Sequence, residues 1–228
     1  MDTPVIPPPP TPAIPVTGGQ GRFPVRRVYC VGRNYRAHAV EMGHDPDRDP
    51  PFFFQKNPDD LDSSGVFPYP PCSAEVHHEV ELAVALARGG RDIPAEAALD
   101  CVWGYAVALD MTRRDLQARM KEQGRPWEVA KAFARSAPIG ALTPRATAAG
   151  MGSGRIALRV NDTLRQDGDL AAMIWPLPEL IAHLSGYFVL APGDVILTGT
   201  PAGVGPVQPG DRLHATIEGL DPLDVKVV

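Results

Sequence analysis

Two glutamates one residue apart, in the segment 77–82, constrain this chain more than any other feature. The segment runs directly into the apolar residues 83–87, which favours a β-strand. Alternate side chains of a strand leave on the same face, so Glu79 and Glu81 are expected about 7 Å apart. Carboxylates this close repel each other unless one is protonated or a cation lies between them. The segment therefore predicts either a solvated acidic face or a cation site.

A third acid favours the cation site. Residues 103–109 form a continuous apolar run, as in a buried strand, and the run ends on Asp110. Three carboxylates make an all-oxygen site that suits Mg²⁺, Mn²⁺ or Ca²⁺ better than zinc, and we expect Mg²⁺ or Mn²⁺. The zinc-protease helix motif needs a second histidine four residues after the first. Leu82 stands four residues after His78, so this motif is absent from the segment.

Composition narrows the class of protein. The chain has 228 residues, 44% of them apolar, and a net charge of −5, which fits one globular domain. It offers no clustered basic face for nucleic acid, and no apolar run long enough to cross a bilayer. The three cysteines lack metal-site spacing, and no leader-like segment opens the sequence. We expect a cytoplasmic protein without nucleic-acid or membrane partners.

The N-terminal segment differs in composition from the rest. Residues 4–15 contain seven prolines, which favour extended polyproline geometry and bury little surface. We therefore expect a flexible tail over residues 1–22 and a single catalytic domain over residues 23–228. The alternative for the tail is an arm that docks against a neighbouring subunit.

A histidine and a glutamate are predicted to meet on a short helix. The helix is expected over residues 34–42, capped by Asn34, and it places His38 and Glu41 three positions apart. Residues at this spacing are neighbours on a helix surface, so Glu41 can accept a hydrogen bond from one imidazole nitrogen and leave the other as a base. A surface ion pair is the alternative interpretation.

Several further residues are candidates for binding an anion. Lys56 ends a short predicted strand, and Lys131 is flanked by apolar residues. Arg114 and Gln117 lie three apart in a predicted helix over residues 112–124, so they can face one site. The glycine-rich run 198–205 can bring backbone amides and a hydroxyl close to an anion. A surface lysine, a solvated helix face and an ordinary turn are the respective alternatives.

Taken together, these motifs resemble the fumarylacetoacetate hydrolase family, and within it the branch of fumarylpyruvate hydrolases and acylpyruvases. The resemblance covers the chain from about Val28 onward. It rests on motifs that occur in the same order: 32–35 with His38 and Glu41, 78–81, 104–110, Asp115 with Gln117, Lys131 with Phe133, Asn161 with 165–166, and 198–205.

The resemblance implies a fold and a set of roles. It implies an α+β, β-rich fold, a mixed β-roll with short flanking helices, and a homodimer. Glu79, Glu81 and Asp110 would hold Mg²⁺ or Mn²⁺, and His38 with Glu41, on a mobile lid, would activate water. The residues around the substrate would be Lys131 as a catalytic group and Arg33, Lys56, Arg114, Gln117 and Thr200 as binding groups.

The implied activity is hydrolysis of a carbon–carbon bond in a 2,4-diketo acid. Fumarylpyruvate, cleaved to fumarate and pyruvate as in aromatic catabolism, is the expected substrate, and its far carboxylate needs a cation such as Arg33, Arg36 or Lys56. The alternatives are hydrolysis of another acylpyruvate, and decarboxylation or tautomerisation of a keto-diacid such as oxaloacetate on the same fold.

Overall fold

A central six-stranded sheet carries Glu81, and Glu79 and Asp110 lie at the ends of two of its strands. In the computed structural model, which describes residues 4–19, 21–41, 50–148 and 150–228, this sheet has the order β12-β9-β8-β15-β3-β4. Its strands are β12 (Thr143–Pro144), β9 (Val102–Leu109), β8 (Val80–Leu86), β15 (Asp194–Leu197), β3 (Arg27–Gly32) and β4 (Phe52–Lys56). Every residue of β8 is buried, because both faces of the sheet are covered.

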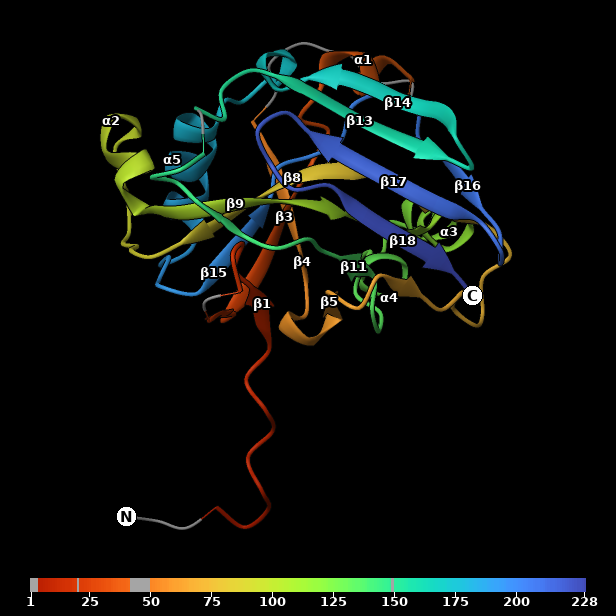
Figure 1. Cartoon of the computed structure of the whole chain (residues 1–228), viewed down its shortest axis with the longest axis horizontal. Coiled ribbons are helices and arrows are strands. Elements are labelled where there is room, and N and C mark those ends of the chain that lie inside the picture. Colours follow the sequence, from red (N-terminus) through yellow and green to blue (C-terminus); the bar gives the residue numbers. More distant parts are fainter. Residues whose placement is uncertain (1–3, 20, 42–49, 149) are drawn as a thin grey trace.

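A five-stranded sheet lies against one face of this central sheet (Figure 1). Its order is β14-β13-β17-β18-β6, with strands β14 (Thr163–Asp169), β13 (Arg155–Val160), β17 (Arg212–Ile217), β18 (Leu223–Val227) and β6 (Val66–Phe67). Large side chains such as Leu82 and Val84 of β8 and Leu158 of β13 share one buried cluster. The main core therefore lies between the two sheets.

The opposite face of the central sheet is made of small residues. Ala83 and Ala85 of β8 and Ala106 and Ala108 of β9 belong to a second buried cluster, which also contains Ile14. Ile14 lies in a hairpin of β1 (Ala13–Pro15) and β2 (Arg22–Pro24). The second half of the segment 1–22 thus contributes to the core, while Val5 and Ile6 are exposed on an extended stretch leading away from the body (Figure 1).

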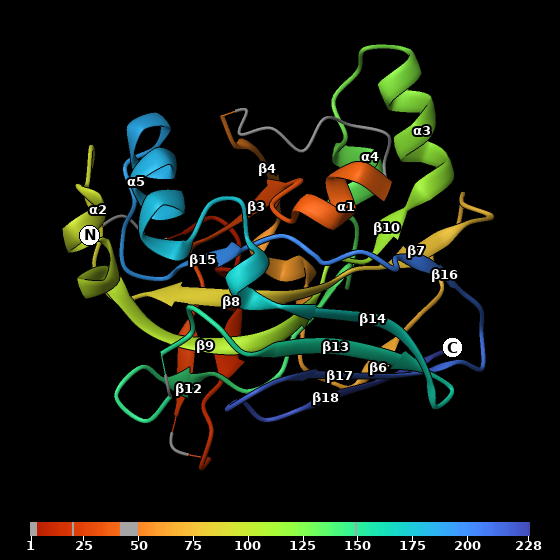
Figure 2. The ribbon, with the colours of Figure 1, turned by 90° about the horizontal axis from the view of Figure 1, so that it is seen from above.

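Short elements surround these layers. A three-stranded sheet has the order β10-β7-β16, with strands β10 (Thr112–Arg113), β7 (Val76–His78) and β16 (Gly205–Val207), and β11 (Ala137–Pro138) pairs with β5 (Leu61–Asp62). The α-helices are α1 (Arg36–Glu41), α2 (Ala95–Ala98), α3 (Arg114–Glu122), α4 (Glu128–Lys131) and α5 (Leu177–Tyr187). Figure 2 shows α1, α3 and α4 gathered near the end of β4, with α2 and α5 at the other end of the molecule.

These elements confirm the expected β-rich α+β fold. The boundary between tail and domain stays a prediction. The helix expected over residues 34–42 is described up to Glu41, and Met42 lies outside the described residues. Asn34 does not cap it: its amide donates to Thr198 O at 2.8 Å and accepts from Trp175 N. No helix among the described residues is long and apolar enough to cross a membrane.

Candidate active site

The three predicted carboxylates converge where the chain passes from one sheet to another. The strand expected through residues 77–82 is interrupted at Glu79, which joins β7 to β8. β8 and β9 pair antiparallel with Val80 opposite Leu109, and Asp110 N donates to Glu79 O at 2.8 Å. Pairing therefore brings Asp110, just after β9, beside the glutamates. One oxygen from each of the three buried carboxylates lies within 4.8 Å of the others.

The charge of this group is only partly compensated by the protein. Burial, together with the negative charges of Asp110 and Glu79, raises the pKa of Glu81 well above its usual value. Glu81 accepts one hydrogen bond, from Gly199 N at 2.7 Å. Burial also acts against a charge on Glu79, but Lys131 and Arg114 hold its pKa well below the usual range. Glu79 is thus held as an anion by the protein's own cations, whereas a bound cation would stabilise the anionic form of Glu81.

Two buried lysines position the carboxylates. The Lys131 ammonium donates to Glu79 Oε2 at 2.7 Å, Asp110 Oδ2 at 2.7 Å and Thr112 Oγ1 at 2.6 Å. Burial alone would lower the pKa of Lys131, but attraction to Asp110 and Glu79 raises it. Lys56 Nζ forms an ion pair with Asp110 Oδ1 at 2.8 Å and donates to Ser136 Oγ at 2.9 Å. Asp110 is therefore held between two ammonium groups.

The first turn of α3 closes one side of the site. Arg114 donates to Glu79 Oε1 and, at 2.5 Å, to Gln117 Oε1. The spacing of three positions on a helix does bring Arg114 and Gln117 together, as the sequence predicts. Both line a pocket with Glu79, Glu81 and Lys131.

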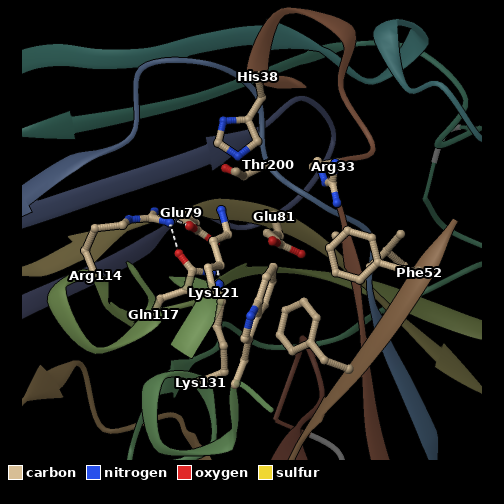
Figure 3. Close-up of a pocket in the computed structure, with 14 residues that line it drawn as sticks. Arg33, His38, Phe52, Glu79, Glu81, Arg114, Gln117, Lys121, Lys131 and Thr200 are labelled. Atoms are coloured by element: carbon tan, nitrogen blue, oxygen red, sulfur yellow. Dashed lines mark hydrogen bonds and ion pairs between the residues drawn. The ribbon is translucent and has the colours of Figure 1, made fainter. Parts of the chain in front are cut away.

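The predicted histidine and glutamate pair lies across the pocket from the carboxylates. His38 Nδ1 is 3.1 Å from Glu41 Oε2, and Glu41 also accepts from Gly203 N at 3.0 Å. Figure 3 shows the His38 imidazole directed into the cavity toward Thr200 and the two glutamates. Because Glu41 takes the Nδ1 side, the Nε2 side of the ring faces the pocket.

The carboxylate group fits a hard divalent ion. All three donor side chains carry oxygen and are buried, and burial and the charges of Asp110 and Glu79 raise the pKa of Glu81, an effect that a bound cation would oppose. No cysteine or histidine belongs to the group, so the donor set favours Mg²⁺ or Mn²⁺ over zinc. The expected divalent cofactor is consistent with this chemistry.

The 198–205 loop connects the carboxylates to the histidine pair. Gly199 N binds Glu81 and Gly203 N binds Glu41, while Thr200 Oγ1 donates to Val80 O at 2.8 Å. A side-chain amide supports Thr200 from behind: Gln166 Nε2 donates to Thr200 Oγ1 at 2.8 Å and to Pro201 O at 2.9 Å.

Gln166 is in turn fixed by the strand that carries the glutamates. Its Oε1 accepts from Val80 N at 3.1 Å and lies 2.9 Å from His78 Nδ1, which makes Nδ1 the donor of that pair. Burial lowers the pKa of His78 to about 4, so this imidazole is neutral. Sequence reasoning used residues 165–166 only as part of the resemblance and gave Gln166 no role.

Most of the predicted site residues share one pocket. His38, Glu79, Glu81, Lys131, Arg33, Arg114, Gln117 and Thr200 line it, together with residues that the sequence did not single out: Val31, Gly32, Phe52, Phe54, Lys121 and Trp127. Lys56 lies behind Asp110 and outside this lining, and Arg36 is exposed on α1. Lys121 follows Gln117 by four positions, so the helical spacing that pairs Arg114 with Gln117 also points to it.

Comparison with known proteins identifies relatives over nearly the whole chain. Residues 27–228 match the fumarylacetoacetate (FAA) hydrolase C-terminal family. A crystal structure of fumarylpyruvate hydrolase from Pseudomonas aeruginosa, in complex with Mn²⁺ and pyruvate, superposes with a TM-score of 0.97 at 49% identity and covers 99% of each chain. That Mn²⁺ complex and the carboxylate group here agree on a divalent cofactor, as the sequence predicts.

Two other relatives carry different names. The mitochondrial oxaloacetate tautomerase FAHD1 of Arabidopsis thaliana is 42% identical over 201 residues, which are 88% of this chain and 90% of the relative. The structure of 5-carboxymethyl-2-hydroxymuconate delta-isomerase from Mycobacterium smegmatis is 33% identical with a TM-score of 0.80 and covers 91% of this chain and 80% of that one. Hydrolysis and isomerisation both occur among these names.

Proposed function

Because this chain belongs to the fumarylacetoacetate hydrolase family, whose members are enzymes, we propose that it hydrolyses the C3–C4 bond of a 2,4-diketo acid. The observation that carries the proposal is the His38 and Glu41 pair facing three buried carboxylates across one pocket. Fumarylpyruvate, from aromatic catabolism, is the proposed substrate, and fumarate and pyruvate are the products. The 49% identity to a fumarylpyruvate hydrolase supports this choice.

Glu79, Glu81 and Asp110 would hold Mg²⁺ or Mn²⁺. The ion would supply Lewis-acid polarisation of the keto oxygens at the pyruvate end of the substrate. Lys131 and Lys56 keep Glu79 and Asp110 in place for it, since the two ammonium groups reduce the repulsion between these carboxylates.

His38 supplies the base for the attacking water. Its Nε2 removes a proton from water, and the oxygen adds to the C4 carbonyl carbon, while Glu41 holds the ring and stabilises the imidazolium. The C3–C4 bond then breaks, its electron pair goes to the pyruvate fragment as an enolate, and His38 returns the proton to C3. Water is thus divided between the new carboxylate and the new methyl group.

The other residues bind and orient the substrate. Arg114 and Gln117 line the side of the pocket next to Glu79, where they can bind the substrate's keto and carboxylate oxygens. Lys131 adds positive charge close to the developing enolate. Thr200 lines the pocket with its hydroxyl already donating to Val80 O and accepting from Gln166 Nε2, so it positions the substrate by contact.

Tautomerisation of oxaloacetate is the second candidate. The 42% identity to an oxaloacetate tautomerase supports it, and a base facing the same carboxylates can move a proton between carbon and oxygen without a water molecule. The two candidates differ in what His38 must activate, which is water in one case and a substrate C–H in the other.

A direct assay separates these functions. The purified protein is mixed with fumarylpyruvate, acetylpyruvate or oxaloacetate, with added Mg²⁺ or with chelator, and loss of the diketo absorbance is followed while pyruvate is counted enzymatically. We expect metal-dependent release of one pyruvate per fumarylpyruvate consumed. Enol-to-keto conversion of oxaloacetate without any pyruvate from fumarylpyruvate would refute the hydrolase assignment.

We also propose that the enzyme is a homodimer. Membership of the fumarylacetoacetate hydrolase family, for which the sequence resemblance implies a homodimer, supports this proposal. Light scattering on the purified protein, at several concentrations, tests this with an expected mass of two chains. A single-chain mass at every concentration would contradict it.

A further inference from the structure

Three aromatic side chains form one wall of the pocket. Phe52 and Phe54 project from β4, and Trp127 precedes α4. The Trp127 ring lies edge-on to Phe52 with centroids 5.4 Å apart, and its centroid is 6.1 Å from that of Phe54. We call these three residues the aromatic wall. Aromatic faces favour flat, conjugated groups, because such groups can stack on them.

The chain makes room for this wall at one position. A Cβ added to Gly32 would meet Phe52 Cζ at 1.9 Å, so any side chain there would displace the ring. Glycine at position 32 therefore allows Phe52 to lie directly over β3 at the pocket.

Two cations stand at the mouth of the pocket beside the aromatic wall. The Arg33 guanidinium lies 4.8 Å from the centroid of Phe52, and Lys121 Nζ lies 5.3 Å from that of Trp127. Both residues are exposed and both line the pocket. Within the described ranges of the chain, neither forms an ion pair with a carboxylate, unlike Lys56, Lys131 and Arg114 deeper in the site.

These two cations also act on each other. Partial burial, with the charges of Arg114 and Arg33, lowers the pKa of Lys121. Within the part of the chain that the structure describes, Arg33 and Lys121 thus bring two positive charges to the pocket lining without an ion-paired carboxylate of their own, although Glu79 also attracts Lys121. An anionic group of the ligand would relieve this repulsion.

We propose that the aromatic wall, Arg33 and Lys121 form a subsite for the acyl end of the substrate, and that they select a flat, unsaturated acyl chain ending in a carboxylate. The inference rests on the proposed function and names the substrate class for the same site. The pyruvate end lies toward the buried carboxylates, the conjugated chain passes along the aromatic wall, and the far carboxylate pairs with Arg33 and Lys121. Acetylpyruvate lacks this second carboxylate.

Paired substrates test the subsite. Arg33→Gln and Lys121→Met are assayed on fumarylpyruvate and on acetylpyruvate with saturating Mg²⁺. We expect each variant to raise KM for fumarylpyruvate about tenfold, as for a lost charge-assisted hydrogen bond, and to leave kcat/KM for acetylpyruvate within about twofold. Lys121→Glu should raise the fumarylpyruvate KM further. Arg119→Gln is the matched control, because Arg119 is exposed on the same helix and does not line the pocket.

The affinity for fumarate tests the subsite without turnover. Mn²⁺-loaded protein is titrated calorimetrically with fumarate, and both variants should bind it about tenfold more weakly than the wild type and Arg119→Gln do. Equal losses on both substrates, or unchanged fumarate affinity in both variants, would overturn the subsite. If the wild type cleaves neither diketo acid, the proposed function fails and the fumarate titration still decides the subsite.

Discussion

The floor and the rim of the pocket are built in opposite ways. Glu79, Glu81 and Lys131 line the floor, and Asp110 and Lys56 lie beneath it and are counted with it. All five are 5% exposed or less and bind one another or the backbone. The rim carries His38 on α1, Arg33 just before it and Lys121 on α3. Among the described residues, His38 pairs with Glu41, and the two cations lie over the rings of Phe52 and Trp127.

This difference separates two tasks. A floor fixed by charge pairs in a buried environment can hold an ion and a keto acid in one geometry, which serves hydrolysis, decarboxylation and tautomerisation alike. Under the proposed function, the rim would determine which bond reacts and which acyl group enters. The 198–205 loop contacts both parts, through Gly199 to Glu81 and through Gly203 to Glu41, so it holds the His38 and Glu41 pair in position relative to the floor.

The largest effect is expected when the floor loses a carboxylate. Glu79→Ala should reduce cleavage to the background rate and remove the dependence on added metal, because one of three ligands is lost and Lys131 and Arg114 lose their shared partner. Calorimetric titration with Mn²⁺ and the fumarylpyruvate assay measure this. Glu75→Ala is the control, an exposed acid nearby. Normal turnover of Glu79→Ala in chelator would refute the metal assignment.

Removal of the His38 imidazole should lower activity less than loss of Glu79 does, and it should leave the carboxylate site intact. We expect His38→Ala to lower kcat by about 10² to 10⁴, the usual range for lost acid–base catalysis, with unchanged Mn²⁺ affinity. His214→Ala is a matched control, since His214 pairs with Asp224 at 2.7 Å away from the pocket lining. An unchanged kcat in His38→Ala would remove this residue from the mechanism. Lost Mn²⁺ binding would mean that the carboxylate site depends on His38, so that rim and floor are not separate.

A smaller effect is expected at the support between them. Gln166→Met should lower kcat/KM about tenfold and the free energy of unfolding by about 1–3 kcal/mol, because Val80 N and His78 Nδ1 lose a buried acceptor. Gln166 is a positioning residue, so the loss should fall mainly on KM through a displaced Thr200. Denaturant melts and steady-state kinetics measure both quantities, with Gln55→Met, exposed on β4, as control. Lost stability with unchanged KM would leave Gln166 a purely structural role.

The floor was predictable from local sequence patterns, but its supports were not. Two glutamates in alternation and an aspartate at the end of an apolar strand identify three candidate metal ligands, because strand geometry fixes where such side chains point. The fold and the family followed from the order of the motifs. The interruption at Glu79 depends on β7 pairing in a different sheet from β8, and such long-range pairing leaves no local mark.

The surroundings of Lys56, Gln166 and Lys121 depend on tertiary contacts that local sequence patterns do not reveal. Lys56 has the features of a ligand-binding lysine at a strand end, but its ammonium group pairs with the Asp110 carboxylate and does not line the pocket. Gln166 contacts residues more than 30 positions away along the chain. Lys121 did carry a signal, the helical spacing from Arg114 and Gln117, but its position over the Trp127 ring, which supports the proposed subsite, depends on the fold.

The smallest effect on turnover is expected on the far side of the central sheet. Ile14 is 1% exposed in the β1–β2 hairpin and packs with the small residues of β8 and β9, including Ala83 and Ala108. Ile14→Ala should lower the free energy of unfolding by about 2–5 kcal/mol, as for other large-to-small changes in a core, while kcat and KM below the melting temperature stay within twofold. Val5→Ala, on the exposed stretch, is the control and should leave the unfolding midpoint unchanged. A large fall in kcat for folded Ile14→Ala would mean that the floor depends on packing beneath the sheet as well as on its charge pairs.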